Sequence, residues 1–554
     1  MAPTHRQPQP GGSPGSKQGN GQEIQPRTGL AIRLALWIPA LFSAAILILF
    51  AGSLYPVPDG DAIYFLPAIQ SFAATGKLAN PLVELSVQTD PSGAGRFLFY
   101  TPGFPLLFGS LLSWLGADSY RDALTLLACA RAASVLLFTQ AIVVWIQSHR
   151  PLQTRWHGVL AGALVLSNGL FLFASNGRPE ILSMLILSIA LLAVVAVRSG
   201  IARQLILCTC IALLFPISIA NGLIGFSFYL FYQVLTLRSA GQRLALLALT
   251  VLLASVLTAG AYAAAGLPLA DGIHGLALHS RLQLSRANAG LMAFVPFWRT
   301  WILFGLLALL SLGMQIRLFL RDRCRGAIDR LWLLLALTGL TCCIAVFGLR
   351  VAPIHYNFYA FLPLYQALAL QLCAASRPAG CRPAGGRRAR RLAEWALVAA
   401  IALALIEPAQ AIILYPYFLS SKPSYQEARA AVARLNDGAC HLIYTDGLFT
   451  LDPSRSGSQF RLNPASRGGV FSARIASGNQ APRCIVALVQ EVNGKNQPPR
   501  GWPQIADVSD RSAATEQLRA LHLLRSPKGY SFRAYRLEPA VPKPASPQAV
   551  LQQI

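Results

Sequence analysis

Long apolar runs recur along this chain and limit what it can fold into. The first runs from about Leu30 to Leu54 and contains ALWIPALFSAAILILFAGSL. About 20 apolar residues in a helix cross the roughly 30 Å of hydrocarbon in a bilayer. Hydrophobic residues make up 54% of the chain and charged residues only 12%, against roughly 25% charged in soluble domains. This composition excludes a disordered chain and argues against a purely soluble one.

The sequence predicts an α-helical polytopic membrane protein with about eleven transmembrane helices. The first run is too long for the apolar part of a cleavable signal peptide, and no small-residue cleavage site follows it, so we expect a retained anchor. Residues 1–29 are rich in Pro, Gly, Gln and Ser and are expected to be a disordered cytoplasmic tail. The expected spans are 30–54, 122–146, 157–175, 180–198, 203–219, 221–237, 244–266, 294–316, 331–349, 352–373 and 393–415.

Basic loops between these spans predict the orientation of the chain. The clearest of them run from Arg317 to Arg330 and from Arg377 to Arg391, and the positive-inside rule places such loops in the cytoplasm. A further apolar run, Phe97–Gly116, would reverse every later loop if it spanned the membrane. We therefore expect it to be a juxtamembrane or re-entrant element within a first outer loop, residues 55–121. The net charge of +25 then serves mainly to orient the chain against anionic headgroups, and nucleic acid is not needed to explain it.

Polar composition returns after Tyr415. Residues 416–540 are expected to form a small α/β domain on the periplasmic side, and residues 541–554 a tail. Ser424 and Glu427 fit a capping box that opens a helix, and HLIYTDG, CIVALVQE and SFRAYRLEP have the pattern of strands. Cys440 and Cys484 begin two of these strands, and they are compatible either with a disulfide in an oxidising periplasm or with two free thiols.

Two carboxylates stand just beyond the first span, in the segment PVPDGDAIYF. Asp59 and Asp61 are two residues apart, ahead of a stretch with apolar residues at helical spacing. Carboxylates at such an interface raise each other's pKa, and they can act as a general base or hold a divalent cation. The alternative is structural, with Asp59 capping the following helix and Asp61 favoured by its dipole.

The order of motifs resembles the GT-C superfamily of polytopic glycosyltransferases, which includes protein O-mannosyltransferases and aminoarabinose transferases. The resemblance covers about residues 40–415. It rests on five short motifs: Asp59-Gly-Asp61 with Tyr64, Ala74-Thr-Gly76, Tyr100-Thr-Pro-Gly-Phe-Pro-Leu-Leu107, Arg178-Pro-Glu180 and His355-Tyr-Asn-Phe-Tyr359.

This resemblance implies a GT-C-like fold and a reaction. An acidic residue of the first outer loop would deprotonate an acceptor hydroxyl, and the donor would be a sugar on a polyprenyl phosphate, transferred with inversion. The commoner family pattern is Asp-Glu followed three residues later by Tyr, which puts Gly60 at the Asp position here. In the same register Asp61 takes the Glu position. Asp59 is the slightly favoured base, because the neighbouring glycine would let a ligand approach its backbone, and Asp61 is the alternative.

A leaving polyprenyl phosphate develops negative charge, which cationic groups on the outer side must stabilise. Arg350 with His355 is the favoured pair, although snorkelling toward headgroups is the ordinary role of a boundary arginine. The further candidates for substrate binding are Tyr64, Lys77, Arg96, Arg178, Glu180, His274, His279, Arg281 and Tyr356.

The expected function is a glycosyltransferase that moves a sugar from a polyprenyl phosphate donor to a lipid, glycan or protein acceptor on the outer face of a bacterial inner membrane. The sequence shows no Walker loop and no G-x-G-x-x-G motif after a strand, which argues against a nucleotide-sugar donor. The sequence establishes no cofactor, and a divalent cation stays open, with Asp59 and Asp61 as its candidate ligands. Two alternatives stay open: a transporter or lipid flippase, and a surface-glycan polymerase or ligase without an aspartate base.

Overall fold

The computed structural model of the chain is mostly helical. It describes residues 26–53, 62–80, 82–83, 89–92, 95–149, 177–237, 239–286, 337–338, 422–435, 440–444, 446–451, 460–461, 484–489, 502–508 and 532–537. The expected spans at 157–175, 294–316, 352–373 and 393–415 lie outside these residues, as does nearly all of 331–349. The total of about eleven spans therefore stays a prediction.

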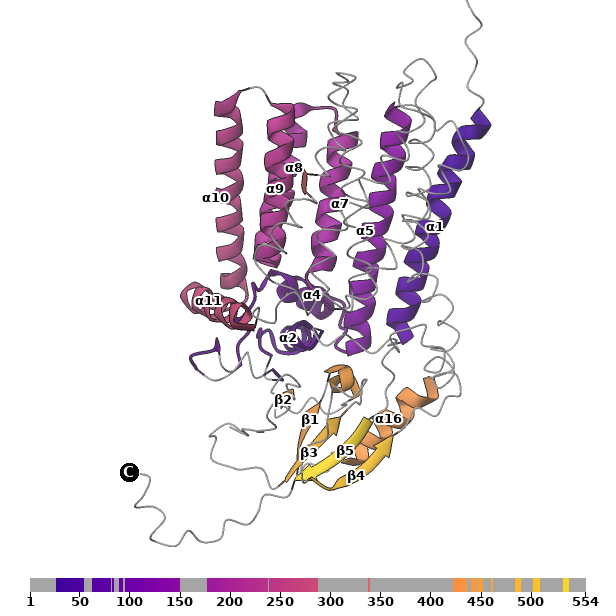
Figure 1. Cartoon of the computed structure of the whole chain (residues 1–554), viewed down its shortest axis with the longest axis vertical. Helices are drawn as coiled ribbons and strands as arrows, with labels where there is room; N and C mark the ends of the chain where they lie inside the picture. Colours follow the sequence, from indigo (N-terminus) through magenta and orange to yellow (C-terminus); the bar gives the residue numbers. More distant parts are fainter. Residues whose placement is uncertain are drawn as a thin grey trace, which may run out of the picture.

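Six long helices stand side by side as a bundle (Figure 1). They are α1 (Pro26–Ser53), α5 (Tyr120–His149), α7 (Glu180–Ala196), α8 (Gly200–Ile217), α9 (Ile219–Thr236) and α10 (Ala240–Ala264). Neighbours in the bundle pack directly, α1 on α5, α5 on α7, and α8 on α7, α9 and α10. Each of these helices covers an apolar run that was expected to span the membrane, and α1 begins at Pro26, four residues before the expected start.

Four helices in the described part of the chain contain segments long and apolar enough to cross a membrane: Tyr120–Ala141, Gly200–Ile217, Ile219–Thr236 and Ala240–Ala264. The apolar parts of α1 and α7 are shorter. Around Asn221 two expected spans follow each other closely, and Ser218 separates them. Its extended backbone ends α8, and its side chain accepts a hydrogen bond from the Asn221 amide at the start of α9. A helical architecture with these apolar segments suits a membrane protein.

Three shorter helices lie across one end of the bundle: α2 (Ala62–Thr75), α4 (Gly103–Trp114) and α11 (Leu269–Arg286) (Figure 1). We call these helices, together with residues 76–101, the end layer. Helix α4 has 12 residues, which at 1.5 Å per residue reach only about 18 Å, well short of the hydrocarbon thickness. It lies against Pro216 near the end of α8, so the expected juxtamembrane run packs beneath the bundle rather than through it.

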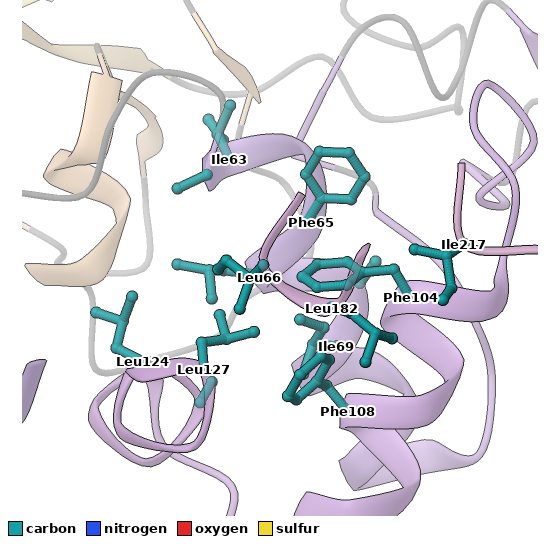
Figure 2. Packing of buried hydrophobic residues seen from close by; sticks show 14 of the residues in the cluster. Ile63, Phe65, Leu66, Ile69, Phe104, Phe108, Leu124, Leu127, Leu182 and Ile217 are labelled. Carbon is teal, nitrogen blue, oxygen red and sulfur yellow. The ribbon is translucent and has the colours of Figure 1, made fainter. Parts of the chain in front are cut away.

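Apolar side chains join the end layer to the bundle (Figure 2). Phe65, Leu66 and Ile69 of α2 are buried and meet Phe104 and Phe108 of α4. The other side of this contact is formed by the bundle helices α5, α7 and α8, through Leu124, Leu127, Leu182 and Ile217. Burial of such side chains stabilises the contact by roughly 1.5–3 kcal/mol each. The end layer therefore has a fixed position on the bundle.

A five-stranded sheet follows in the carboxyl-terminal part of the chain. Its strands are β1 (Cys440–Tyr444), β2 (Phe460–Arg461), β3 (Cys484–Val489), β4 (Gln504–Val508) and β5 (Phe532–Leu537), in the order β2-β1-β3-β5-β4. Strand β1 pairs in parallel with β2 and β3, and β5 pairs antiparallel with β3 and β4. The sequence predicted β1, β3 and β5 but missed β2 and β4. Strand β2 is very short, and β4 exposes much of its surface and lacks an apolar run.

Two helical elements accompany the sheet, the helix α16 (Lys422–Leu435) and the 3-10 helix η6 (Asp446–Leu451). Helix α16 begins two residues before Ser424, so this serine is not the cap that the sequence indicated. Pro423 lies in its first turn, where the missing amide hydrogen costs nothing. The short helix η6 contacts both α16 and α2. The helix expected around 513–524 lies outside the described residues.

Cys440 and Cys484 lie opposite each other in β1 and β3 and form a disulfide across 44 residues of sequence. In the chain-entropy account a loop of this length stabilises the folded state by about 4 kcal/mol. We expect the double variant Cys440→Ala, Cys484→Ala to speed proteolytic cleavage within residues 416–540 of the full chain in membranes. Cys129→Ala, which removes an exposed free thiol, is the control. Equal cleavage rates for the native chain and the double variant would contradict this role of the disulfide.

Candidate functional site

The described residues between α2 and α4 fold back on one another and on α2. Residues 78–80 lie antiparallel to 95–97, joined by hydrogen bonds from the Asn80 amide to the Gly95 carbonyl and from the Phe97 amide to the Leu78 carbonyl. The Asn80 side chain donates from Nδ2 to the carbonyl oxygens of Ile63 (2.7 Å) and Tyr64 (2.9 Å). Pro67 lies four residues after Ile63 in α2 and has no amide hydrogen for that carbonyl. Asn80 therefore supplies the hydrogen bond that the proline removes.

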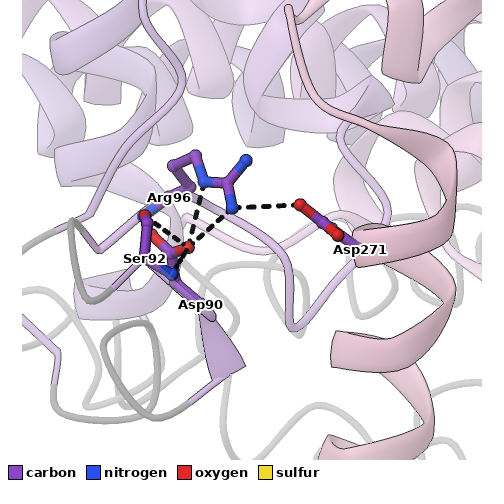
Figure 3. Close-up of polar contacts among 4 residues, drawn as sticks. All are labelled: Asp90, Ser92, Arg96 and Asp271. Carbon is purple, nitrogen blue, oxygen red and sulfur yellow. Dashed lines mark hydrogen bonds and ion pairs between the residues drawn. The ribbon is translucent and has the colours of Figure 1, made fainter.

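Arg96 connects this loop to a helix far away in the sequence (Figure 3). Its Nε and Nη2 donate to Asp90 Oδ1 at 3.0 and 2.8 Å, and its backbone amide donates to Asp90 Oδ2 at 2.9 Å. The same Nη2 donates to Asp271 Oδ2 of α11 at 3.0 Å, across 175 residues of sequence. Ser92 adds a hydroxyl and an amide donor to Asp90 Oδ1. We call Asp90, Arg96 and Asp271 the Arg96 clamp.

Burial and hydrogen bonding shift the pKa of Asp90 in opposite directions. The Asp90 side chain is fully buried, while 28% of Arg96 and 33% of Asp271 remain exposed. Burial acts to raise the pKa of Asp90, but the hydrogen bonds from Arg96 and Ser92 outweigh it and hold this pKa well below its ordinary value. The hydrogen bond to Asp90 in turn raises the pKa of Arg96. Asp90 and Arg96 are therefore both charged at neutral pH.

An aromatic cluster lies beside the Arg96 clamp. Tyr64 of α2 makes edge contacts with Phe99 and Tyr100, at ring-centroid distances of 5.8 and 6.3 Å. His279 of α11 is buried and lies 4.8 Å from the Tyr100 ring. Such contacts contribute about 0.5–1.5 kcal/mol beyond area burial. The structure thus gathers three of the predicted residues, Tyr64, Arg96 and His279, in one layer.

A second polar group lies where α7 meets α2. Arg178 Nη2 donates to Glu180 Oε1 at 2.8 Å, and both side chains are almost completely buried. Gly177, just before them, has a φ of 81° and packs against the first residue of α2. A methyl group at Gly177 would lie 3.2 Å from the Ala62 Cα. This contact brings the Arg-Pro-Glu triplet to the start of α2, and Asp61 directly precedes Ala62 in the sequence.

Arg131 is a functional candidate that the sequence analysis missed. It is 2% exposed in the apolar helix α5 and interacts electrostatically with Glu180. It lies eleven residues beyond Tyr120, roughly 16 Å along the helix. A buried charge therefore lies well inside an apolar helix. The available signal was a lone arginine inside an apolar run, which is costly in a membrane and is a functional candidate for that reason.

The remaining predicted residues fall into two groups. Lys77, His274 and Arg281 have exposed side chains, so they lie on the surface of the end layer rather than in its interior. Outside the described residues lie Asp59, Asp61, Arg350, His355 and Tyr356. The roles of this second group stay sequence predictions. Asp90 and Asp271 were missed, because neither belongs to a motif and only the folded chain brings them to Arg96.

No group of three or more His, Cys, Asp or Glu side chains is placed to hold a metal ion within the part of the chain that the structure describes. Asp59 and Asp61, the predicted ligands of a divalent cation, lie outside that part. Comparison with known proteins gives no relative: no protein-family model matches the chain, and no curated protein does.

We expect Arg96→Met to lower the free energy of unfolding by about 2 kcal/mol, because it leaves the buried Asp90 carboxylate without its cation. Asp271→Asn, at a side chain one-third exposed, is the matched control and should cost less than about 1 kcal/mol. Unfolding of the purified chain by SDS titration in mixed micelles measures both. Equal losses for the two variants would mean that the buried Arg96–Asp90 pair stabilises the fold no more than the partly exposed Arg96–Asp271 pair.

The low pKa of Asp90 predicts an acid dependence of stability. The folded-state pKa lies below the unfolded value of about 3.9, so the stabilisation is fully present above that pH and is lost as the pH falls below it. Asp90→Asn removes this titrating group. Unfolding measured between about pH 5 and pH 2 should show a steeper loss of stability for the native chain than for the variant. Parallel pH profiles would contradict the assignment.

Proposed function

We propose that the protein is an integral membrane glycosyltransferase that takes its sugar from a polyprenyl phosphate at the outer face of a bacterial inner membrane. It would have about eleven spans in a GT-C-like arrangement, with its amino end in the cytoplasm and its carboxyl-terminal sheet outside. The observation that carries the proposal is the contact between Gly177 and Ala62. It joins the Arg-Pro-Glu triplet to the segment that directly follows Asp59 and Asp61, two motifs separated by more than a hundred residues.

In the proposed reaction, Asp59 or Asp61 accepts the proton of the acceptor hydroxyl. The hydroxyl oxygen forms a bond to the anomeric carbon, and the bond from that carbon to the phosphate oxygen breaks. The polyprenyl phosphate leaves with the electron pair, on the opposite side from attack, so the anomeric configuration inverts. Arg350 and His355 are proposed to stabilise the developing phosphate charge, and Arg178 is a further cation on the same side.

Several features of the described residues support this proposal. The expected outer segments meet at one end of the bundle: Gly177 lies on α2, α4 lies on α8, and Gly275 of α11 lies on Leu98. An active site at the membrane surface suits a donor whose lipid tail stays in the bilayer and an acceptor that arrives from outside. The buried position of Arg178 and Glu180 favours electrostatic interactions, which are stronger away from water.

The alternative of a transporter or flippase is favoured by one observation, the buried charge of Arg131 inside α5. Ionisable residues within spans often mark transport pathways. The two functions differ in their products. Proteoliposomes that move a polyprenyl-linked sugar across the bilayer, without releasing polyprenyl phosphate, would favour transport.

We expect Asp59→Asn or Asp61→Asn to lower transfer by roughly two to four orders of magnitude, the usual contribution of a general base. The assay supplies reconstituted protein with a panel of polyprenyl phosphate sugars, and with a cell-envelope extract as the source of acceptor hydroxyls. It measures released polyprenyl phosphate by mass spectrometry, so the acceptor need not be identified beforehand. Asp118→Asn, which changes an exposed carboxylate next to the end layer, is the control and should keep full activity. Full activity in both Asn variants at positions 59 and 61 would refute the proposed base.

A further inference from the structure

Helix α11 turns one side toward the protein. Gly272 lies against the Tyr262 ring, and Gly275 lies so close to the first loop that a methyl group there would be 2.6 Å from the Leu98 carbonyl oxygen. His279 follows one turn later and packs on Tyr100. Residues at these spacings share one face of a helix. The small glycine residues allow α11 to lie flat against the rest of the end layer.

The outward side of α11 is divided into two strips. Leu269 and Ile273 are four residues apart, and they are 40% and 59% exposed. His274 and Arg281 are seven residues apart, two turns of the helix, and their side chains are also exposed. Adjacent positions such as 273 and 274 differ by about 100° around a helix, so the apolar and the cationic residues form neighbouring strips. This division is typical of a helix that lies in the plane of a membrane surface.

The position of α11 relative to α10 agrees with this pattern. Helix α10 is long and apolar enough to span a membrane, and it exposes Val251, Leu252 and Val256 by 53–60%. Gly266, with a φ of 66°, lies in the turn that follows α10. Helix α11 then lies across the end of α10 (Figure 1). Helix α11 therefore lies at the end of a helix that exposes apolar side chains.

We propose that α11 lies in the headgroup layer of the outer leaflet, where Leu269 and Ile273 enter the acyl region and His274 and Arg281 meet lipid phosphates. The occupant of this face is the phospholipid surface. The position of α11 at the end of a span-length helix with exposed apolar residues favours lipid over a second protein, and the cationic strip is complementary to phosphate. Helix α4 also favours a position of the end layer in the headgroup region. It ends in Trp114, which is 82% exposed, and Trp is enriched at membrane interfaces.

This contact has a consequence for the first outer loop. Asp271 belongs to α11 and binds Arg96, which binds Asp90. A bilayer that fixes the depth of α11 therefore also fixes the depth of Asp90 and Arg96. The lipid contact itself does not depend on the proposed reaction, so it can be tested in protein of any activity.

The experiment places one environment-sensitive fluorophore on the full chain in phospholipid vesicles, through Ile273→Cys, Arg281→Cys or Ile505→Cys. Ile505 is a matched control because it is an exposed isoleucine, 42% accessible, on strand β4 of the sheet. The native chain, carried through the same labelling, gives the background from its own cysteines. Quenchers attached either to the lipid headgroup or to the acyl chain then report the depth of each label.

We expect the label at 273 to show blue-shifted emission and the greatest loss of emission with acyl-chain quenchers. The label at 281 should lose most emission with headgroup quenchers, and the label at 505 should be quenched by neither. Lipid quenching at 273 no greater than at 505 would overturn the proposal, and so would equal depths for 273 and 281. The folded state of each labelled protein is checked by its SDS unfolding profile, and Ala277→Cys replaces Ile273→Cys if that variant unfolds early.

Discussion

The guanidinium of Arg96 joins two segments that lie far apart in the sequence. It binds the buried carboxylate of Asp90, between α2 and α4, and the one-third exposed carboxylate of Asp271 in α11. An ionised carboxylate away from water is costly unless a cation and further donors surround it. Arg96 and Ser92 supply those donors, so these hydrogen bonds fix Asp90 and Ser92 relative to Arg96. Asn80 fixes the other arm of the loop by binding the carbonyl that Pro67 leaves free in α2. The end layer is consequently an ordered surface on which a reaction at a membrane boundary can be organised.

The apolar bundle sets where this surface lies. Helices that cross hydrocarbon must satisfy their backbone hydrogen bonds internally, and their ends gather at two levels. Helices α2, α4 and α11 occupy one of these levels, together with the Arg178–Glu180 pair at the start of α7. Arg131 is the exception, because its buried charge interacts with Glu180 from within α5. Burying these charges is costly, and the role that we propose for them, binding an anionic lipid phosphate, would account for that cost.

Much of this architecture could be predicted from the sequence. Apolar runs of span length indicate helices that lie outside water, and basic loops indicate segments that lie in it. The break at Ser218 and the juxtamembrane position of α4 both follow from local chemistry and parity. Strand β4 could not be predicted, because its exposed surface leaves no periodic apolar pattern. Asp90 and Asp271 could not be found for a different reason. A single aspartate carries no signal until folding brings it to Arg96, whereas Asp59 and Asp61 stand out by their spacing alone. Arg131 could have been found, since an arginine within an apolar run is unusual in itself.

The central claim is that a polyprenyl phosphate binds at the end layer, next to the first outer loop and the start of α7. Photocrosslinking tests it most directly, with a polyprenyl phosphate that carries a diazirine close to the phosphate and with the full protein in vesicles. Mass spectrometry of the crosslinked peptides should find the label within residues 54–101 and around Arg178, and excess unlabelled polyprenyl phosphate should remove it. Crosslinks confined to the opposite ends of the helices, near Arg198 and Arg243, would contradict the account.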